Sequence, residues 1–150
     1  MKWSCKAFKD LTLDEFHDII QLREAVFVVE QDCPYLDVDG KDKDALHVFG
    51  EYQGNIVATT RILKPGKSYD EVAIGRVVTS PTVRGMGMGK QLMEESMKFV
   101  QLHFGKVPIR ISAQTYLLKY YKSFGFLETG KEYLEDNIPH LEMLYKPQYS

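Results

Sequence analysis

The feature that most constrains the fold of this 150-residue chain is a glycine-rich turn between a strand and a helix. Residues 71–79 are rich in β-branched side chains and are followed closely by a proline, as a strand end requires. Residues 87–104 carry apolar side chains at helical spacing. Gly85, Gly87 and Gly89 lie where the two meet. This order is typical of folds in which helices cover a sheet.

The rest of the chain also interleaves strands and helices. Thr12 and Glu15 form a capping box, so a helix is expected to begin there and to end before Cys33-Pro34. Strands are predicted at residues 3–8, 46–52, 56–63, 109–113, 128–135 and 140–146, and a short helix at 116–124. The order β-α-β-β-β-α-β-α-β-β predicts an α+β fold (α/β, three-layer). We expect a mixed central sheet flanked by helices, in a single domain spanning residues 1–150.

In the first helix, the apolar spacing places one side chain set inward and leaves Arg23 and Glu24 near the solvent edge. The inward set is Phe16, Ile19, Ile20, Val26 and Phe27. An acidic segment, residues 32–44, follows. Its spacing fails the calcium-loop pattern, because placing Gly40 sixth puts Tyr35 first and Leu46 twelfth. A solvated loop is therefore expected there.

Composition excludes several classes of protein. Apolar residues make up 44% and charged residues 27%, with 19 Lys+Arg against 21 Asp+Glu and a net charge of −2, which argues against a nucleic-acid surface. No apolar run has the length of a membrane span, and the N-terminal residues lack a secretory pattern. Cys5 and Cys33 match no metal or redox spacing and are expected to be free thiols that fill the core, in a cytoplasmic protein.

The glycine-rich turn suits an anion. The first amides of a helix lack intrahelical partners and lie at the positive end of its dipole. Glycines without Cβ atoms let a phosphate approach these amides, and Arg84 and Lys90 add positive charge. The pattern favours a pyrophosphate cradle, although a flexible turn before a helix would need the same glycines.

Both common nucleotide motifs fail here. A phosphate-binding Walker loop needs glycine where Arg84 stands and Ser or Thr where Gln91 stands. The dinucleotide fingerprint needs glycine at Lys90 or, one step later, at Leu92.

The segment Arg84-x-x-Gly87-x-Gly89, after a strand and Pro81 and before a helix, resembles the acyl-CoA loop of the GCN5-related N-acetyltransferases (GNAT). The aromatic helix end Tyr120-Tyr121-Lys122-Ser123-Phe124-Gly125-Phe126 resembles a second landmark of that family. Residues 26–35, 39–42 and 74–78 are similar to its ElaA-like branch. The resemblance covers essentially the whole chain and implies the GNAT acyl-CoA N-acyltransferase fold.

The resemblance also implies where acetyl-CoA, the acyl donor, would bind. A strand before the loop would expose its backbone to the pantetheine arm, and an amide near Val78 would stabilise the oxyanion. Loop amides would hold the pyrophosphate. The residues implied are Val77, Val78, Thr79, Arg84, Gly85, Met86, Gly87, Met88, Gly89 and Lys90.

The family's general acid, a tyrosine four residues before the helix-ending glycine, corresponds to Tyr121. A phenol is protonated near neutral pH and can deliver a proton to a departing thiolate. Without the resemblance, the tyrosines of this helix would be expected only to pack against the core. Tyr120 is expected in the core in either case.

The sequence does not identify the general base. Many relatives carry a glutamate on the strand before the loop, but this chain has Ala73-Ile74-Gly75-Arg76-Val77 there. Glu30 and His140 are the candidates, against a helix-end ion pair for the first and a turn or strand-edge residue for the second. Some relatives use a water chain instead.

The chain is thus expected to be an acetyl-CoA-dependent N-acetyltransferase that moves an acetyl group directly to a primary amine. The sequence does not identify the acceptor, which could be a small molecule or a peptide, and a homodimer is possible. No binding of a metal, a nucleic acid or a membrane is expected. The acidic segment would attract a cationic acceptor if it bordered the pocket. The alternatives are a non-catalytic acyl-CoA-binding module and a transferase of longer acyl groups.

Overall fold

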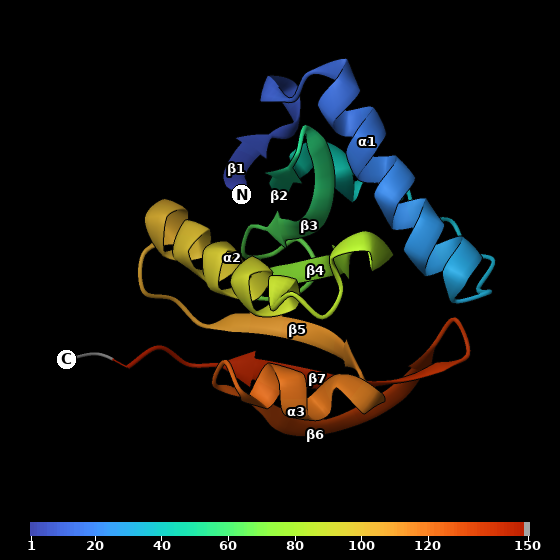
Figure 1. Ribbon diagram of the computed structural model, residues 1–150. Helices are drawn as coiled ribbons and strands as arrows, with labels where there is room; N and C mark the ends of the chain where they lie inside the picture. The colour runs from blue at the N-terminus through green and yellow to red at the C-terminus, as the bar shows by residue number, and fades with distance from the viewer. Residues whose placement is uncertain (149–150) are drawn as a thin grey trace.

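The structure is a computed structural model that describes residues 1–148, and it contains one seven-stranded mixed sheet (Figure 1). The strands lie in the order β1-β2-β3-β4-β5-β7-β6. Their bounds are β1 Lys2–Ala7, β2 Leu46–Tyr52, β3 Asn55–Leu63, β4 Val72–Thr79, β5 Ile109–Gln114, β6 Phe126–Glu135 and β7 Ile138–Tyr145. All seven were predicted, with ends that differ by at most two residues, which confirms the GNAT-like α+β fold together with the comparisons below.

The helices follow the predicted order with one difference in geometry. They are α1 Leu13–Arg23, α2 Met88–Phe104 and α3 Leu118–Lys122. The Thr12–Glu15 capping box is formed in both directions. The predicted continuation of α1 toward Cys33 is a π-helix, Glu24–Glu30, rather than α-helix. Among residues 1–148, no helix combines the length and the apolar character needed to cross a bilayer.

Helices α1 and α2 cover opposite faces of the sheet. Thr60 of β3 points to α2, where its hydroxyl lies 2.8 Å from that of Ser96. The neighbouring Thr59 lies opposite Val78 of β4, and Val78 packs against Leu22 and Val26 on the α1 side. The main core lies on the α2 side, where α2 and α3 cover strands from β2 to β7. This three-layer arrangement is visible in Figure 1.

Strands β4 and β5 run parallel but pair for only two residues. The pairs are Val72 with Ile109 and Ala73 with Arg110. Beyond them the strands diverge, and a wedge opens toward the C-terminal end of each strand, as Figure 1 shows. The backbone of β4 from Ile74 onward therefore has no strand partner on this side.

A bulge in β4 lies beside the wedge. Thr59 and Arg61 of β3 pair with Val78 and Gly75 of β4, so β4 has one extra residue between these pairs. Arg76, in the bulge, adopts φ of +51°, which is unusual for a residue with a side chain. The bulge turns the Arg76 side chain toward the segment that follows α1.

That segment is held by buried ion pairs, which corrects two expectations. Arg23 was expected near solvent but is 1% exposed, because it follows Ile19 by one helical turn on the inner face. Its guanidinium binds Asp37 at 2.7 Å and Asp42 at 2.8 Å. Asp37 and Asp42 are buried as well, so the expectation of a solvated loop is wrong for these two residues, while Asp32, Asp39 and Asp44 are exposed. Arg61 also pairs with Asp42, at 3.2 Å.

We predict that these ion pairs make stability fall in acid. Burial raises the pKa of Asp42, but the hydrogen bonds and charges of Arg23 and Arg61 outweigh it, so that the pKa lies below the ordinary 3.8. A lowered pKa stabilises the folded state above pH 3.8, and this stability is lost as the pH falls through the folded-state pKa. Urea unfolding between pH 7 and 2 measures it.

The variant Asp42→Asn should lower the free energy of unfolding at pH 7 by about 3–5 kcal/mol, since it leaves two buried guanidiniums undercompensated. The matched control is Asp44→Asn, because Asp44 pairs with Lys67 at the surface. It should leave the urea midpoint unchanged. Equal midpoints for Asp42→Asn and the parent would contradict the prediction.

Candidate active site

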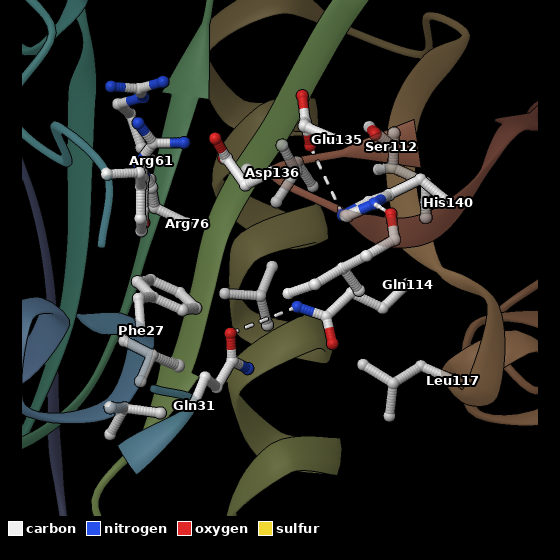
Figure 2. A pocket seen from close by; sticks show the side chains of 18 of the residues that line it. Phe27, Gln31, Arg61, Arg76, Ser112, Gln114, Leu117, Glu135, Asp136 and His140 are labelled. Carbon is white, nitrogen blue, oxygen red and sulfur yellow. Dashed lines mark hydrogen bonds and ion pairs between the residues drawn. The ribbon is translucent and has the colours of Figure 1, made fainter. Parts of the chain in front are cut away.

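A cavity of about 920 Å³ occupies the wedge and extends beyond it. The C-terminal half of β4 and the residues of β5 form its walls, the π-helix and the segment after it lie along one rim, and the β6–β7 turn lies along the other (Figure 2). Gln114 Nε2 donates to Gln31 Oε1 across it at 3.4 Å. Cys33 Sγ donates to the Asp136 carbonyl at 3.7 Å. The first rim therefore touches the β5 wall at Gln114 and the other rim at Asp136.

The glycine-rich turn lies at the end of β4 and begins α2. Gly87, the N-cap residue, has φ of +73°, and no side chain caps the helix. A Cβ at Gly85 or Gly87 would have no heavy atom within 4 Å, so these glycines leave open space beside the first amides. Among the predicted loop donors, the Met86 amide already donates to the Val83 carbonyl, at 3.4 Å.

Gly89 has a different role from the other two glycines. A Cβ there would lie 3.3 Å from the Tyr120 hydroxyl. That hydroxyl donates to the Gly89 carbonyl at 2.7 Å, so Gly89 lets α3 dock on the start of α2. The contact explains Tyr120, which is half-buried against the main core as expected.

Tyr121 points the other way and lines the cavity. Its side chain is 5% exposed, and its hydroxyl makes no hydrogen bond to any of residues 1–148. Burial, together with Tyr120 and Tyr116 nearby, raises the pKa of Tyr121 well above its ordinary value. The phenol is thus protonated at neutral pH and free to donate into the cavity.

Arg84 and Glu30 form an ion pair at the cavity mouth. Arg84 Nη1 lies 2.6 Å from Glu30 Oε1, and both side chains are 42% exposed. Arg84 Nη2 also donates to the Thr79 carbonyl, at 3.4 Å. Glu30 therefore pairs with an arginine at the glycine-rich turn. This contact is the helix-end ion pair that the sequence offered as the alternative to a catalytic role for Glu30.

His140, the third residue of β7, lines the cavity. Its Nδ1 lies 2.7 Å from the Ile138 carbonyl, which can only accept, so Nδ1 carries a hydrogen. Its Nε2 lies 3.3 Å from a Glu135 carboxylate oxygen. Nε2 is the nitrogen that can take up a proton, and the carboxylate would stabilise the resulting cation. The strand begins at Ile138, two residues earlier than expected.

The acidic segment borders the cavity but does not present free acid to it. Asp37 pairs with Arg23 and Arg76, and Asp39 pairs with Arg61 at 2.8 Å and Arg76 at 3.3 Å. Asp42 pairs with Arg23 and Arg61. Each carboxylate is shared by two guanidiniums. The predicted attraction for a cationic acceptor is therefore not supported.

Sequence reasoning missed the arginines at this end of the cavity. Arg61 and Arg76 line it from neighbouring strands, as Figure 2 shows. The sequence signal for this network was Arg23, which falls on the inner face of α1 and is followed by the aspartates of residues 32–44. A buried arginine needs carboxylate partners, and the acidic segment supplies them.

The cysteines are both free thiols. Cys33 is buried, and Cys5 packs against the main core, where burial raises the pKa of its thiol to about 11. His103 Nε2 lies 4.0 Å from Cys5 Sγ, a neighbour that the sequence did not indicate. Neither Cys5 nor His103 lines the cavity.

Several known proteins are similar to this chain in sequence and in fold. Residues 11–147 match the family model described as an acetyltransferase (GNAT) domain. Protein ElaA of Escherichia coli is 39% identical over 145 residues, which are 95% of each chain, and a UPF0039 protein of Synechocystis is 37% identical over 147 residues, 97% of this chain and 96% of the other.

Two solved structures agree with this. An acyl-CoA N-acyltransferase from Pseudomonas aeruginosa has a TM-score of 0.91 and 42% identity, and covers 97% of this chain and 99% of its own. The crystal structure of Escherichia coli ElaA has a TM-score of 0.90 and 38% identity, with 97% and 100% covered. The diverging strand pair and the glycine-rich helix start are consistent with these matches, which span nearly the whole chain. The chain is an acyltransferase of the GNAT acetyltransferase family, in its ElaA-like branch.

Proposed function

We propose that this protein transfers an acetyl group from acetyl-CoA directly to a primary amine. The observation that carries the proposal is the cavity in the β4–β5 wedge, which has Tyr121 in its wall and reaches Thr79 and Arg84, just before the uncapped start of α2. Acyl-CoA use follows from the family, whereas the acetyl donor and the amine acceptor belong to the proposal.

The chain would hold the donor mainly with its backbone. The unpaired edge of β4 at Val77, Val78 and Thr79 would bind the pantetheine amides. Amides of Gly85, Gly87, Met88, Gly89 and Lys90 would receive the pyrophosphate, with Met86 as the loop residue already engaged. Arg84 would exchange Glu30 for the pyrophosphate, because the pyrophosphate carries two negative charges and a carboxylate carries one.

In the transfer, the amine nitrogen attacks the thioester carbonyl carbon and the carbon–sulfur bond breaks. Tyr121 gives its proton to the departing thiolate, which yields a free thiol, and the proton that the acylated nitrogen must lose would restore the phenol. The dry surroundings that raise the pKa of Tyr121 also raise the pKa of a thiolate there, so the two groups remain matched. An amide near Val78 would stabilise the oxyanion.

The ammonium of the acceptor must lose a proton first, and His140 is the better of the two candidate bases. His140 Nε2 is available once the exposed Glu135 side chain moves, while Glu30 is held by Arg84. Direct transfer is supported by the thiols: the Cys33 thiol hydrogen bonds a carbonyl, and the burial of Cys5 disfavours its thiolate.

We predict that Tyr121→Phe lowers kcat by about 10²-fold or more while the Kd for acetyl-CoA changes little, because only the proton donor is lost. Thiol release in the presence of an acceptor amine and calorimetry measure the two quantities. The matched control is Tyr120→Phe, which loses the bond to Gly89 and about 1 kcal/mol of stability but keeps turnover. Equal kcat for Tyr121→Phe and the parent would remove the tyrosine from the mechanism. Tight CoA binding without any amine-dependent release would favour the binding-module alternative.

His140→Gln should lower kcat/KM by about 10²–10⁴-fold, since the proposed proton acceptor is gone. Glu30→Gln is the comparison and should lower kcat/KM much less. If Glu30→Gln causes the larger loss, the base is Glu30. Little change in both variants indicates a water chain.

Gly87→Glu should weaken acetyl-CoA binding by about 100-fold or more, because it places a carboxylate among the amides that each contribute a charge-assisted bond of about 1.5–3 kcal/mol. Calorimetry measures the affinity. Gly87→Ala is the control: it has the same left-handed backbone and adds no charge, so it should keep most of the affinity. Retained binding by Gly87→Glu would refute the cradle.

A further inference from the structure

The end of the cavity away from the glycine-rich turn has two walls of opposite charge. We define the cationic wall as Lys41, Arg61 and Arg76, and the acidic wall as Glu135 and Asp136 with His140. Figure 2 shows Arg61 and Arg76 on one side of this space and Glu135, Asp136 and His140 on the other. The two sets come from opposite sides of the wedge.

The cationic wall has donors to spare. Arg76 Nε lies 2.9 Å from Asp37, and Nη2 donates to the Asp37 carbonyl at 3.0 Å and to Asp39 at 3.3 Å. Nε is buried and, although close to Asp37, makes no hydrogen bond within residues 1–148; Nη1 likewise makes no hydrogen bond or ion pair there, and the side chain is 23% exposed. The bulge with its left-handed backbone aims this guanidinium at the cavity.

Lys41 leaves the wall with surplus charge. Asp37, Asp39 and Asp42 are matched by the three guanidiniums of Arg23, Arg61 and Arg76. Lys41 Nζ donates to the Ser68 hydroxyl at 2.9 Å and has no carboxylate within ion-pair distance in the described chain. One positive charge is therefore uncompensated at this wall.

The acidic wall is the tight turn between β6 and β7. Asp136 and Asn137 have φ of +50° and +63°. The Asp136 carbonyl accepts from Cys33 Sγ, and the Asp136 carboxylate has no ion-pair partner among residues 1–148. The Glu135 side chain is 55% exposed, and its carboxylate lies 3.3 Å from His140 Nε2, with no other ion pair to residues 1–148. This wall suits an ammonium group, and His140 lies beside it to take a proton.

We propose that the acceptor is a small zwitterion of the amino-acid type. Its carboxylate would bind Arg76 Nη1 and Lys41, and its ammonium group would lie at Asp136 and Glu135 beside His140. A polyamine would place cations against Arg76 and Lys41, which like-charge repulsion opposes. The contacts Gln31–Gln114 and Cys33–Asp136 bridge the cavity from the first rim to β5 and to the β6–β7 turn, which suits a free small molecule. This inference rests on the proposed amine acetylation.

The test compares acceptors that differ only in the carboxylate. Thiol release from acetyl-CoA by the full chain is measured with the twenty L-amino acids, ornithine, and the matching methyl esters and decarboxylated amines, such as cadaverine for lysine. The preferred amino acid should have kcat/KM at least about tenfold above its ester and amine, the equivalent of one charge-assisted bond. Equal or better values for the carboxylate-free partners would overturn the inference and leave amine acetylation standing. No release with any acceptor would overturn both.

A pair of neighbouring lysines locates the carboxylate site. Lys41→Gln should raise KM for the preferred amino acid about five- to tenfold, with kcat and the KM of its decarboxylated amine little changed. Lys43→Gln is the control, since Lys43 is on the same short turn and does not line the cavity. Lys41→Gln with unchanged KM, or with an equal change for both acceptors, would overturn the assignment. Both lysines are exposed, so the fold tolerates either change.

Discussion

The separation of β4 from β5 after two residue pairs is the constraint on which the site depends. In most sheets a strand edge is satisfied by its neighbour, and here the C-terminal half of β4 is left with unpaired backbone groups inside the molecule. Such groups need a partner, and an extended arm of amides can supply it in the manner of a missing strand. The wedge therefore explains both the cavity and its preference for an acyl-CoA.

The start of α2 completes the donor half of the site. The helix begins directly after the wedge strand, so the same chain segment presents strand edge and helix amides in sequence. Tyr120 fixes α3 to this helix start through Gly89, and Tyr121 beside it points into the cavity. One short aromatic helix thus couples the position of the loop to that of the proposed proton donor.

The network of Arg23, Arg61 and Arg76 with three aspartates organises the acceptor half. Buried ion pairs contribute little net stability because desolvation opposes their attraction, but they demand one geometry. Here that geometry fixes the segment after α1 over the sheet and leaves Arg76 Nη1 and Lys41 facing the cavity. The residues that hold the segment in place therefore also set the charge that an acceptor meets.

Local sequence determined most of the elements. The capping box, the helical spacing of α2 and the glycine-rich turn each depend on contacts within a few residues, so they could be read without the fold. The resemblance, carried by the turn and the Gly-Phe helix end, indicated the family. The π-helix after α1 was missed because α- and π-helices share nearly the same apolar spacing. The packing role of Gly89 was missed, since its contact with Tyr120 joins residues 31 positions apart.

The order of strands and helices and the uncapped glycine-rich start of α2 could be predicted from the sequence, because both depend on short-range hydrogen bonding. The positions of the charged side chains follow only from the three-dimensional fold. Arg23 is buried and Asp37 neutralised because strands and loops distant in sequence meet there. The pairing of Glu30 with Arg84 and of His140 with Glu135 was decided in the same way. Pairings of this kind depend on distances in space, and no local pattern of residues encodes them.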